Sequence, residues 1–223
     1  QSSAVDGSKA GTVSDIQKIA DGYGHILGGV NGSATPPVAA DFSAVGATVA
    51  GAETGNNLGL LQDVIKGQSD TTGVDTPAEI DTLASAVNAV QAAAAGTPDA
   101  NLAADLAALG ITGVTPGNAA AVAAALAGAA DDGSGTNTVA AIQALVNKAA
   151  AAVQKIHDYA DAQSAGSTGG VGDTTSAGAP TVDDYAAAGI TGVSSSNLAA
   201  LNAALQSSAV DGSKAGTVSD IQK

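Results

Sequence analysis

The chain has no cysteine, methionine or tryptophan, and aromatic residues make up only 2% of its 223 residues. Without cysteine it can form no disulfide, no zinc–thiolate site and no thiol nucleophile. With so few aromatic rings it offers almost no stacking surface for bases or sugars. These absences remove several classes of binding protein and enzyme before any motif is considered.

Positive charge is equally scarce. The seven basic residues are all lysines, against 21 acidic residues, and the net charge is −14. A surface of this sign repels phosphate backbones, so we expect no nucleic-acid partner. No apolar run in the sequence approaches the roughly 20 residues that a membrane-spanning helix needs, so we also expect no membrane span.

In place of these features, the sequence has repetition. Residues 1–18 and 206–223 carry the same letters, QSSAVDGSKAGTVSDIQK, at an offset of 205. A match of this length does not arise by chance. We therefore interpret the chain as a window of a longer array of tandem repeats, each about 205 residues long.

Three related modules are visible inside this repeat. The pentapeptide GITGV occurs at 110–114 and at 189–193, and an Asn follows eight residues after each leading Gly. A more diverged copy runs from Gly46 to Asn57. An Ile that opens a further periodic run follows each Asn by 23 or 24 residues. These isoleucines are Ile80, Ile142 and Ile221, and Ile16 is the same position as Ile221 one repeat earlier.

Each module predicts three helices. A short first helix ends at a Gly, as is typical of a helix C-cap, and a turn leads to a second helix that begins near the Asn. The third helix begins after a Thr, as in the capping box Thr76-Pro77-Ala78-Glu79 and its acidic equivalent Thr12–Asp15. Thr35-Pro36 and Thr97-Pro98 predict capped starts of first helices, with Thr at the N-cap and Pro at the first helical position.

Apolar residues at helical spacing predict the buried face of each third helix. The three expected stripes are Ile16, Ile19, Tyr23 and Ile26; Ile80, Leu83, Val87 and Val90; and Ile142, Leu145, Val153 and Ile156. The expected fold class is all-α, with tandem Ala-rich three-helix bundles. The expected division is 1–34 (end of a second helix, loop and third helix of a module begun in the preceding repeat), 35–96 and 97–163 (three-helix modules), 164–180 (a Gly/Ser/Thr-rich linker) and 181–223 (two helices and the start of a third).

This succession of motifs resembles a known kind of protein. The order of a short helix, Gly, an Asn-Leu helix and then T-V-x-x-I-Q is similar to the three-helix GA-type modules of bacterial surface proteins. The Ala-rich sequence GITGV…NLAALNAAL…TVSDIQ resembles, more closely, the tandem modules of giant repetitive bacterial adhesins and extracellular matrix proteins. The resemblance implies a secreted, cell-surface, tandemly repeated protein. Some GA modules bind serum albumin, but no binding motif for it is matched here.

A few residues invite a chemical interpretation. His25 and His157 lie near the ends of predicted helices, where solvation or the helix dipole explains them better than a metal site. Gly22–Leu27 begins like a dinucleotide fingerprint but lacks its third Gly, so we interpret it as a loosened helix end. Asp131–Asn137 lacks the spacing of a calcium loop, which favours an ordinary solvated loop. Asn31-Gly32-Ser33 has the form of a glycosylation acceptor.

We therefore predict no catalytic, cofactor-binding or metal-binding residues, no cofactor, and no enzymatic activity. Small bundles rich in Ala bury little apolar surface, so each module needs its neighbours for stability, and we expect self-association between neighbouring repeats or copies. The expected function is a structural component of an extracellular bacterial fibre, matrix or adhesin. The alternative is a surface module that binds a host protein or a glycan.

Overall fold

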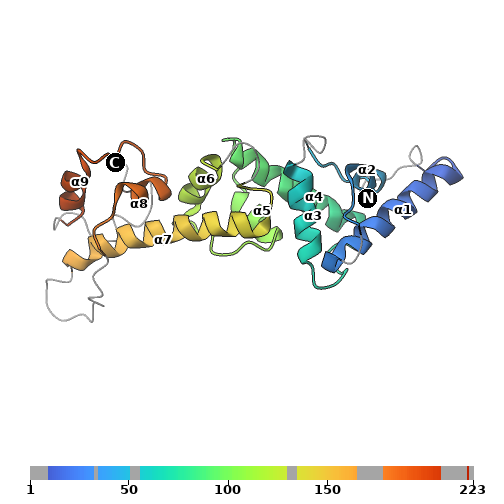
Figure 1. The fold of residues 1–223 in the computed structure, drawn as a ribbon, viewed down its shortest axis with the longest axis horizontal. Coiled ribbons are helices and arrows are strands. Elements are labelled where there is room, and N and C mark those ends of the chain that lie inside the picture. The colour runs from blue at the N-terminus through green and yellow to red at the C-terminus, as the bar shows by residue number, and fades with distance from the viewer. Residues whose placement is uncertain are drawn as a thin grey trace. The chain divides into compact units, whose positions relative to one another are not determined.

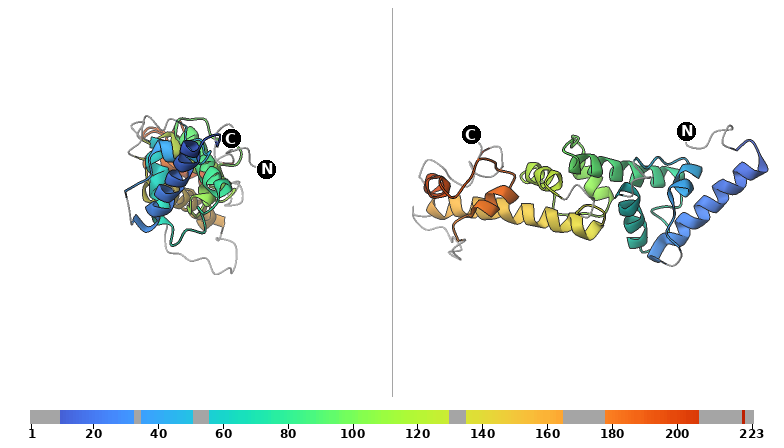
Figure 2. Two further views of the ribbon diagram at one scale, coloured as in Figure 1. Left: turned by 90° about the vertical axis from the view of Figure 1, so that its right-hand side faces the viewer. Right: turned by 45° about the horizontal axis from the view of Figure 1, so that its top comes forward.

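The computed structural model describes residues 10–32, 35–50, 56–129, 135–164, 178–206 and 220. Within these ranges every regular element is a helix and there is no strand, so the predicted all-α class is confirmed (Figures 1 and 2). The elements are α1 (Val13–Gly29), η1 (Val30–Gly32), α2 (Ala39–Ala44), α3 (Asn56–Gly67), α4 (Pro77–Ala94), α5 (Leu102–Ala108), α6 (Ala119–Ala127), α7 (Val139–Ser164), α8 (Val182–Ala187) and α9 (Leu198–Leu205).

The chain divides into two compact units. The first consists of 1–112 with 129–142, and the second of 113–128 with 143–223. Helix α7 thus contributes its first turn to the first unit and its remaining length to the second. The predicted module boundaries stay predictions. No helix in the described ranges is both long enough and apolar enough to cross a membrane.

In the first unit, consecutive helices pack on one another. Helix α1 packs on α2, α3 packs on α4 and η1, and α4 packs on α5. The α1–α2 contact is close at Gly22, where an added Cβ would lie 2.9 Å from the backbone oxygen of Asp41. The interpretation of Gly22–Leu27 as a loosened helix end is therefore wrong. Helix α1 runs without interruption to Gly29, and Gly22 is in the middle of it because a larger residue would not fit against α2.

In the second unit, a buried polar pair connects α8 and α9. Tyr185 is fully buried, and its hydroxyl donates to Asn202 Oδ1 at 2.6 Å. Asn202 Nδ2 in turn donates to the carbonyl of Pro180 at 2.9 Å. Helix α8 also contacts α6, and an added Cβ at Gly189 would lie 2.8 Å from the Cβ of Ala124. Small residues therefore allow these short helices to approach closely.

The predicted ends of the first helices are confirmed. Gly46, Gly110 and Gly189 follow α2, α5 and α8 with φ values of 90°, 80° and 75°, a conformation that favours glycine. After each Gly, the next backbone N–H reaches back to a carbonyl five residues earlier, as in a Schellman motif. These bonds are Ala47 to Phe42 at 2.9 Å, Ile111 to Leu106 at 3.0 Å and Ile190 to Tyr185 at 2.9 Å.

The predicted capping boxes at Thr12 and Thr76 are confirmed, whereas the predicted helix starts at Thr35 and Thr97 are wrong. Capping boxes are formed by Thr12 with Asp15 and by Thr76 with Glu79. Helix α2 does not begin at Thr35. Its N-cap is Val38, because the side chain of Asp41 accepts from the Val38 N–H at 2.7 Å.

Thr97 has a different role from the predicted one. Its N–H and its hydroxyl both donate to the carbonyl of Ala92 at 2.9 Å, so it closes the end of α4 and does not open α5. Helix α5 begins later, with Asn101 as its N-cap, and the Asn101 N–H donates to Asp99 Oδ1 at 2.8 Å. The short Thr-Pro segment is thus occupied by the end of one helix and the turn before the next.

The predicted core stripes differ in outcome. In α4 all four predicted residues are buried, which confirms that stripe. In α7 three of the four are buried and Leu145 is half-buried. In α1 only Ile26 is buried; Ile19 and Tyr23 are half-buried, and Ile16 is 55% exposed. The prediction that Ile16 lies in the core is therefore wrong for this chain, because no described helix covers the start of α1.

Candidate functional site: helix junctions and the start of α1

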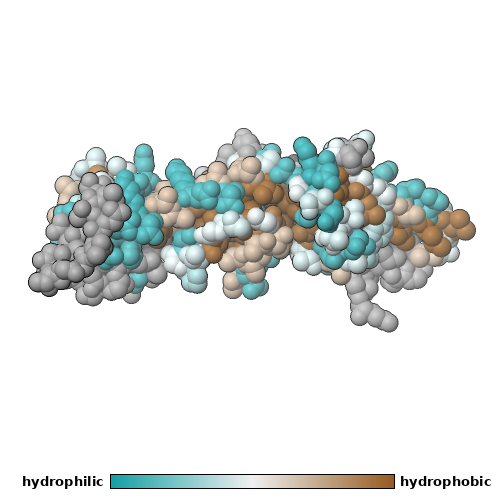
Figure 3. Space-filling model, turned by 90° about the horizontal axis from the view of Figure 1, so that it is seen from below, coloured by the Kyte–Doolittle hydropathy of each residue, from teal (hydrophilic) through white to brown (hydrophobic). Residues whose placement is uncertain are grey.

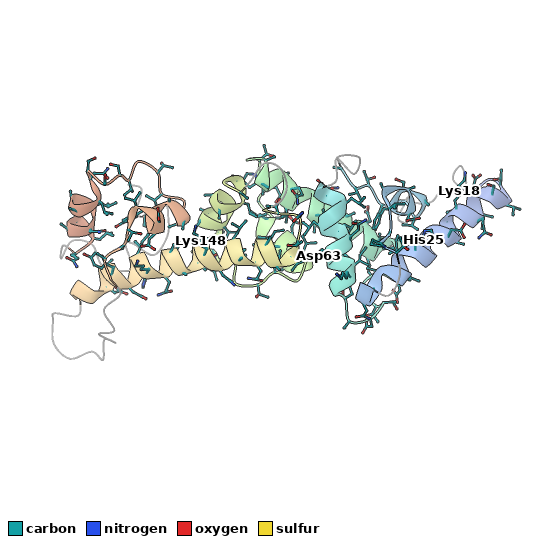
Figure 4. The ribbon with its side chains drawn as sticks, viewed as in Figure 1. Lys18, His25, Asp63 and Lys148 are labelled. Atoms are coloured by element: carbon teal, nitrogen blue, oxygen red, sulfur yellow. The ribbon has the colours of Figure 1, made fainter. Side chains whose placement is uncertain are left out.

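His25 has a specific partner that sequence reasoning missed. Its Nδ1 lies 2.8 Å from Asp41 Oδ1, so the contact joins α1 to α2 (Figure 4). This hydrogen bond and the negative charge of Asp41 raise the pKa of His25 above its ordinary value. The partner is 16 residues away, beyond the end of α1, so periodicity within one helix gave no sign of it. The imidazole remains largely exposed, and the pair therefore links two helices at the surface.

Asp41 has equivalents in α5 and α8, each five residues before the C-cap Gly. Asp184 accepts a hydrogen bond from Lys155 Nζ of α7 at 2.5 Å. Burial alone would raise the pKa of Asp184, but hydrogen bonds from Lys155 and Thr181 outweigh burial and hold this pKa below its usual value. Asp105 is different, because its Oδ2 is buried and has no hydrogen-bond partner among the described residues.

The environment of Asp105 consequently disfavours its ionised form. Burial raises its pKa, and the nearby charge of Asp99 adds to the effect. Among the described residues, Asp41 thus pairs with a histidine and Asp184 with a lysine, whereas Asp105 Oδ2 has no hydrogen-bond partner. The pKa values of Asp105 and Asp184 are therefore shifted in opposite directions, because Asp184 has hydrogen-bond donors that stabilise its ionised form.

The other candidates from the sequence yield no cluster. Nδ1 of His157 lies 3.4 Å from Asp161 Oδ2, within α7. In the described ranges, no group of three His, Cys, Asp or Glu side chains is arranged to hold a metal ion. The loop at 131–134 lies outside the described residues, as does Ser33 of the glycosylation motif. Asn31 of that motif donates its side-chain amide to the carbonyl of Ser69 at 3.1 Å.

The recurring Asn residues close the turns between first and second helices. Asn118 Oδ1 accepts from the N–H of Thr115 at 2.7 Å, and its Nδ2 donates to the carbonyl of Gly113 at 2.8 Å. Asn197 makes the same two bonds, with Ser194 and Gly192, at the same distances. The recurrence of Asn eight residues after the Gly is therefore explained by a structural role.

A carboxylate from α3 accepts a hydrogen bond from the first residue of α7. Asp63 Oδ2 accepts from the N–H of Val139 at 2.8 Å, and Figure 4 places Asp63 near the start of α7. A carboxylate is stabilising at this end of a helix because the free N–H groups carry partial positive charge. No pattern in the sequence indicates this contact, which spans 76 positions.

The most unusual surface is the start of α1. Val13 is 84% exposed and Ile16 is 55% exposed, and Val38 is the one other large hydrophobic residue that is similarly exposed in the described ranges. Figure 3 shows hydrophobic surface at the right-hand end, where α1 begins. By contrast, Ile80 and Ile142, which are equivalent to Ile16 in the repeat, are completely buried. The start of α1 is the candidate interaction surface of this chain.

Comparison with known protein families, with curated proteins and with solved structures gives no significant match.

Proposed function

We propose that this chain is a stretch of a structural protein, built from tandem repeats of about 205 residues, that forms an extracellular bacterial surface fibre, matrix or adhesin. In this proposal the repeat consists of three-helix modules and carries no catalytic site. The observation that carries it is the recurrence of 18 identical residues, at 1–18 and 206–223. A protein that repeats a long unit without change is extended by adding units, which suits a scaffold better than a single binding pocket.

The equivalent positions in the helical parts support this proposal. The Schellman bonds after Gly46, Gly110 and Gly189 have the same form. The side-chain hydrogen bonds that Asn118 and Asn197 make across their turns have the same lengths. At these glycine and asparagine positions, equivalent residues therefore make equivalent bonds. This is the behaviour expected of modules that descend from one unit and fold by the same local rules.

The thin core of the helices also favours an array. Helix α6, whose sequence is AAAVAAALA, buries only Val122 and Leu126 as large apolar residues, together with Ala121. Each Ala removes far less apolar area from water than a Leu, and burial contributes about 25 cal/mol per Å². We infer that each module gains a necessary part of its stability from contacts with the module before it and the module after it.

The test of this function is location and form in the source cells. An antiserum raised against the purified chain should label intact, unpermeabilised cells and surface filaments, with label recurring at a constant axial interval in immunogold images. Serum depleted on the purified chain is the control. Label that appears only after cell lysis would contradict the proposal. Label on the surface without filaments, together with capture of one host protein or glycan, would favour the binding module instead.

A further inference from the structure

The start of α1 lacks a covering that its equivalents have. Ile16 is 55% exposed, whereas Ile80 of α4 is 0% exposed. Four residues further along, Ala20 is exposed and its equivalent Ala84 is completely buried. The covering of α4 includes α3, the second helix of the same predicted module, which packs against it. The start of α1 has no described second helix of its own.

Helix α9, the second helix of its predicted module, has an apolar side chain that is less buried than its equivalents. Leu201 is only half-buried, although its equivalents Leu61 of α3 and Val122 of α6 are completely buried. In the described part of the chain, one surface is therefore the start of a third helix that no second helix covers. Another surface is a second helix whose central apolar side chain is incompletely covered.

The repeat connects these two surfaces. In the sequence, α9 is followed by the segment 206–223. The last six residues of this segment, 218–223, have the same letters as 13–18, the first six residues of α1. The third helix that belongs after α9 thus begins with the same side chains that α1 presents. The side chains at the start of α1 therefore match those expected to pack against α8 and α9.

We propose that the start of α1, from Val13 to Ala20, packs on the α8–α9 pair of a second copy of this sequence, in a head-to-tail contact. This inference rests on the proposed function, of which it supplies the joint between repeats. Ile16 enters the layer that contains Leu201, as Ile80 lies in the core beside α3. The two surfaces differ, so each copy both gives and receives the contact, and such heterologous contacts propagate into a filament.

The first test uses two variants of the full chain, Ile16→Asn and Leu201→Asn, studied by sedimentation over a range of concentrations. The wild-type chain should increase in mass as concentration rises. Each variant should associate at least about tenfold more weakly, because one large apolar side chain no longer leaves water. Mixed in equal amounts, the variants should recover one contact and form a dimer that grows no further, since one copy keeps its α1 surface and the other keeps its α9 surface.

The matched control is Val38→Asn. Val38 is 52% exposed, close to Ile16, but lies at the start of α2, outside the proposed contact. This variant should associate like the wild type. A wild-type chain that stays monomeric at every concentration would overturn the proposal. The proposal would also be overturned if Val38→Asn weakened association as much as Ile16→Asn does. It would equally be overturned if Ile16→Asn abolished association, Leu201→Asn left it intact and the mixture of the two showed no recovery.

Cross-linking keeps the test decisive if Leu201→Asn disturbs the α8–α9 pair. The natural chain has no cysteine, so I16C and L201C each carry a single thiol. Under mild oxidation the mixture should form a disulfide-linked heterodimer in at least about tenfold greater yield than a mixture of V38C with L201C, because disulfide formation needs Cα atoms within about 7 Å. Equal yields would refute the contact.

Different experiments test the proposed contact and the proposed function, so the failure of one can be told apart from the failure of the other. A surface fibre whose repeats are joined only by peptide bonds, with no packing at this place, would leave the proposed function intact and show no recovery in the mixture. Immunogold label confined to lysed cells would remove the proposed function, while the mass and cross-linking results would still decide the contact.

Discussion

The close contact of α1 with α2 at Gly22 predicts that a Gly→Ala substitution in α1 changes stability in a direction that depends on which glycine is replaced. Gly22 and Gly24 lie two residues apart in the same helix, and both have helical backbone angles. At Gly24 an added Cβ meets no atom within 4 Å, whereas at Gly22 it would lie 2.9 Å from the Asp41 backbone oxygen and 3.3 Å from the Cβ of Ala44. The two Gly→Ala substitutions share the same propensity effect and differ only in packing.

The expected magnitudes follow from these two terms. Ala is favoured over Gly inside a helix by about 0.8–1.0 kcal/mol, so Gly24→Ala should stabilise the chain by about 0.5–1 kcal/mol. Gly22→Ala has the same gain, but it forces the α2 backbone away, and overpacking typically costs about 1–3 kcal/mol. The variant with Ala at position 22 should therefore be less stable than the variant with Ala at position 24 by about 1–3 kcal/mol.

Denaturant unfolding followed by far-UV circular dichroism measures both variants against the wild type. Equal stabilisation by the two substitutions would refute the close α1–α2 contact. A loss of stability at Gly24 would refute the open surroundings assigned to that residue. The comparison within one helix cancels errors in extrapolating to zero denaturant, because both variants share the same reference chain.

Three further predictions concern buried or partnered polar groups. Tyr185→Phe should destabilise the second unit by about 1–3 kcal/mol, because Asn202 Oδ1 loses its donor inside the core, and calorimetry should show a lower melting temperature. NMR titration should give His25 a pKa above about 6.5, and Asp41→Asn should lower this pKa. Because the pKa is raised in the folded state, the contact contributes its full stability below about pH 6.5 and loses it as pH rises through the pKa of the folded state. An unchanged pKa of His25 in the variant would contradict the contact. Asp105→Asn should stabilise the chain at pH 7 and have little effect below about pH 3, because a raised carboxyl pKa means that ionisation weakens the fold; a loss of stability at pH 7 would indicate a partner for this carboxylate.

The sequence was sufficient to predict several local features of the fold. The ends of α2, α5 and α8 follow from glycine because the residue after each helix needs a positive φ. The capping boxes of α1 and α4 follow from Thr with an acidic residue three positions later. These features depend on residues close in sequence, where spacing alone fixes the geometry.

Long-range contacts could not be predicted in the same way. The partners of His25 and Val139 lie 16 and 76 positions away, and no periodic pattern connects them. The failure at Ile16 has another cause. Its apolar pattern predicts burial correctly for the equivalent residues, but a pattern says which face of a helix is apolar and not which segment covers it. Thr97 was misassigned because a Thr-Pro pair is compatible with both the end of α4 and the start of α5.

The capping box at Thr12 and Asp15 has a consequence for the rate of the association that we propose for α1. Thr12 and Asp15 satisfy each other's backbone N–H groups at 3.2 Å, so the first turn of α1 is fixed without help from a distant neighbour. A partner that meets α1 finds a preorganised helix, and little conformational entropy remains to be lost on binding. Removing this cap with Thr12→Ala would turn rigid docking into coupled folding and binding, with a slower association rate as its sign.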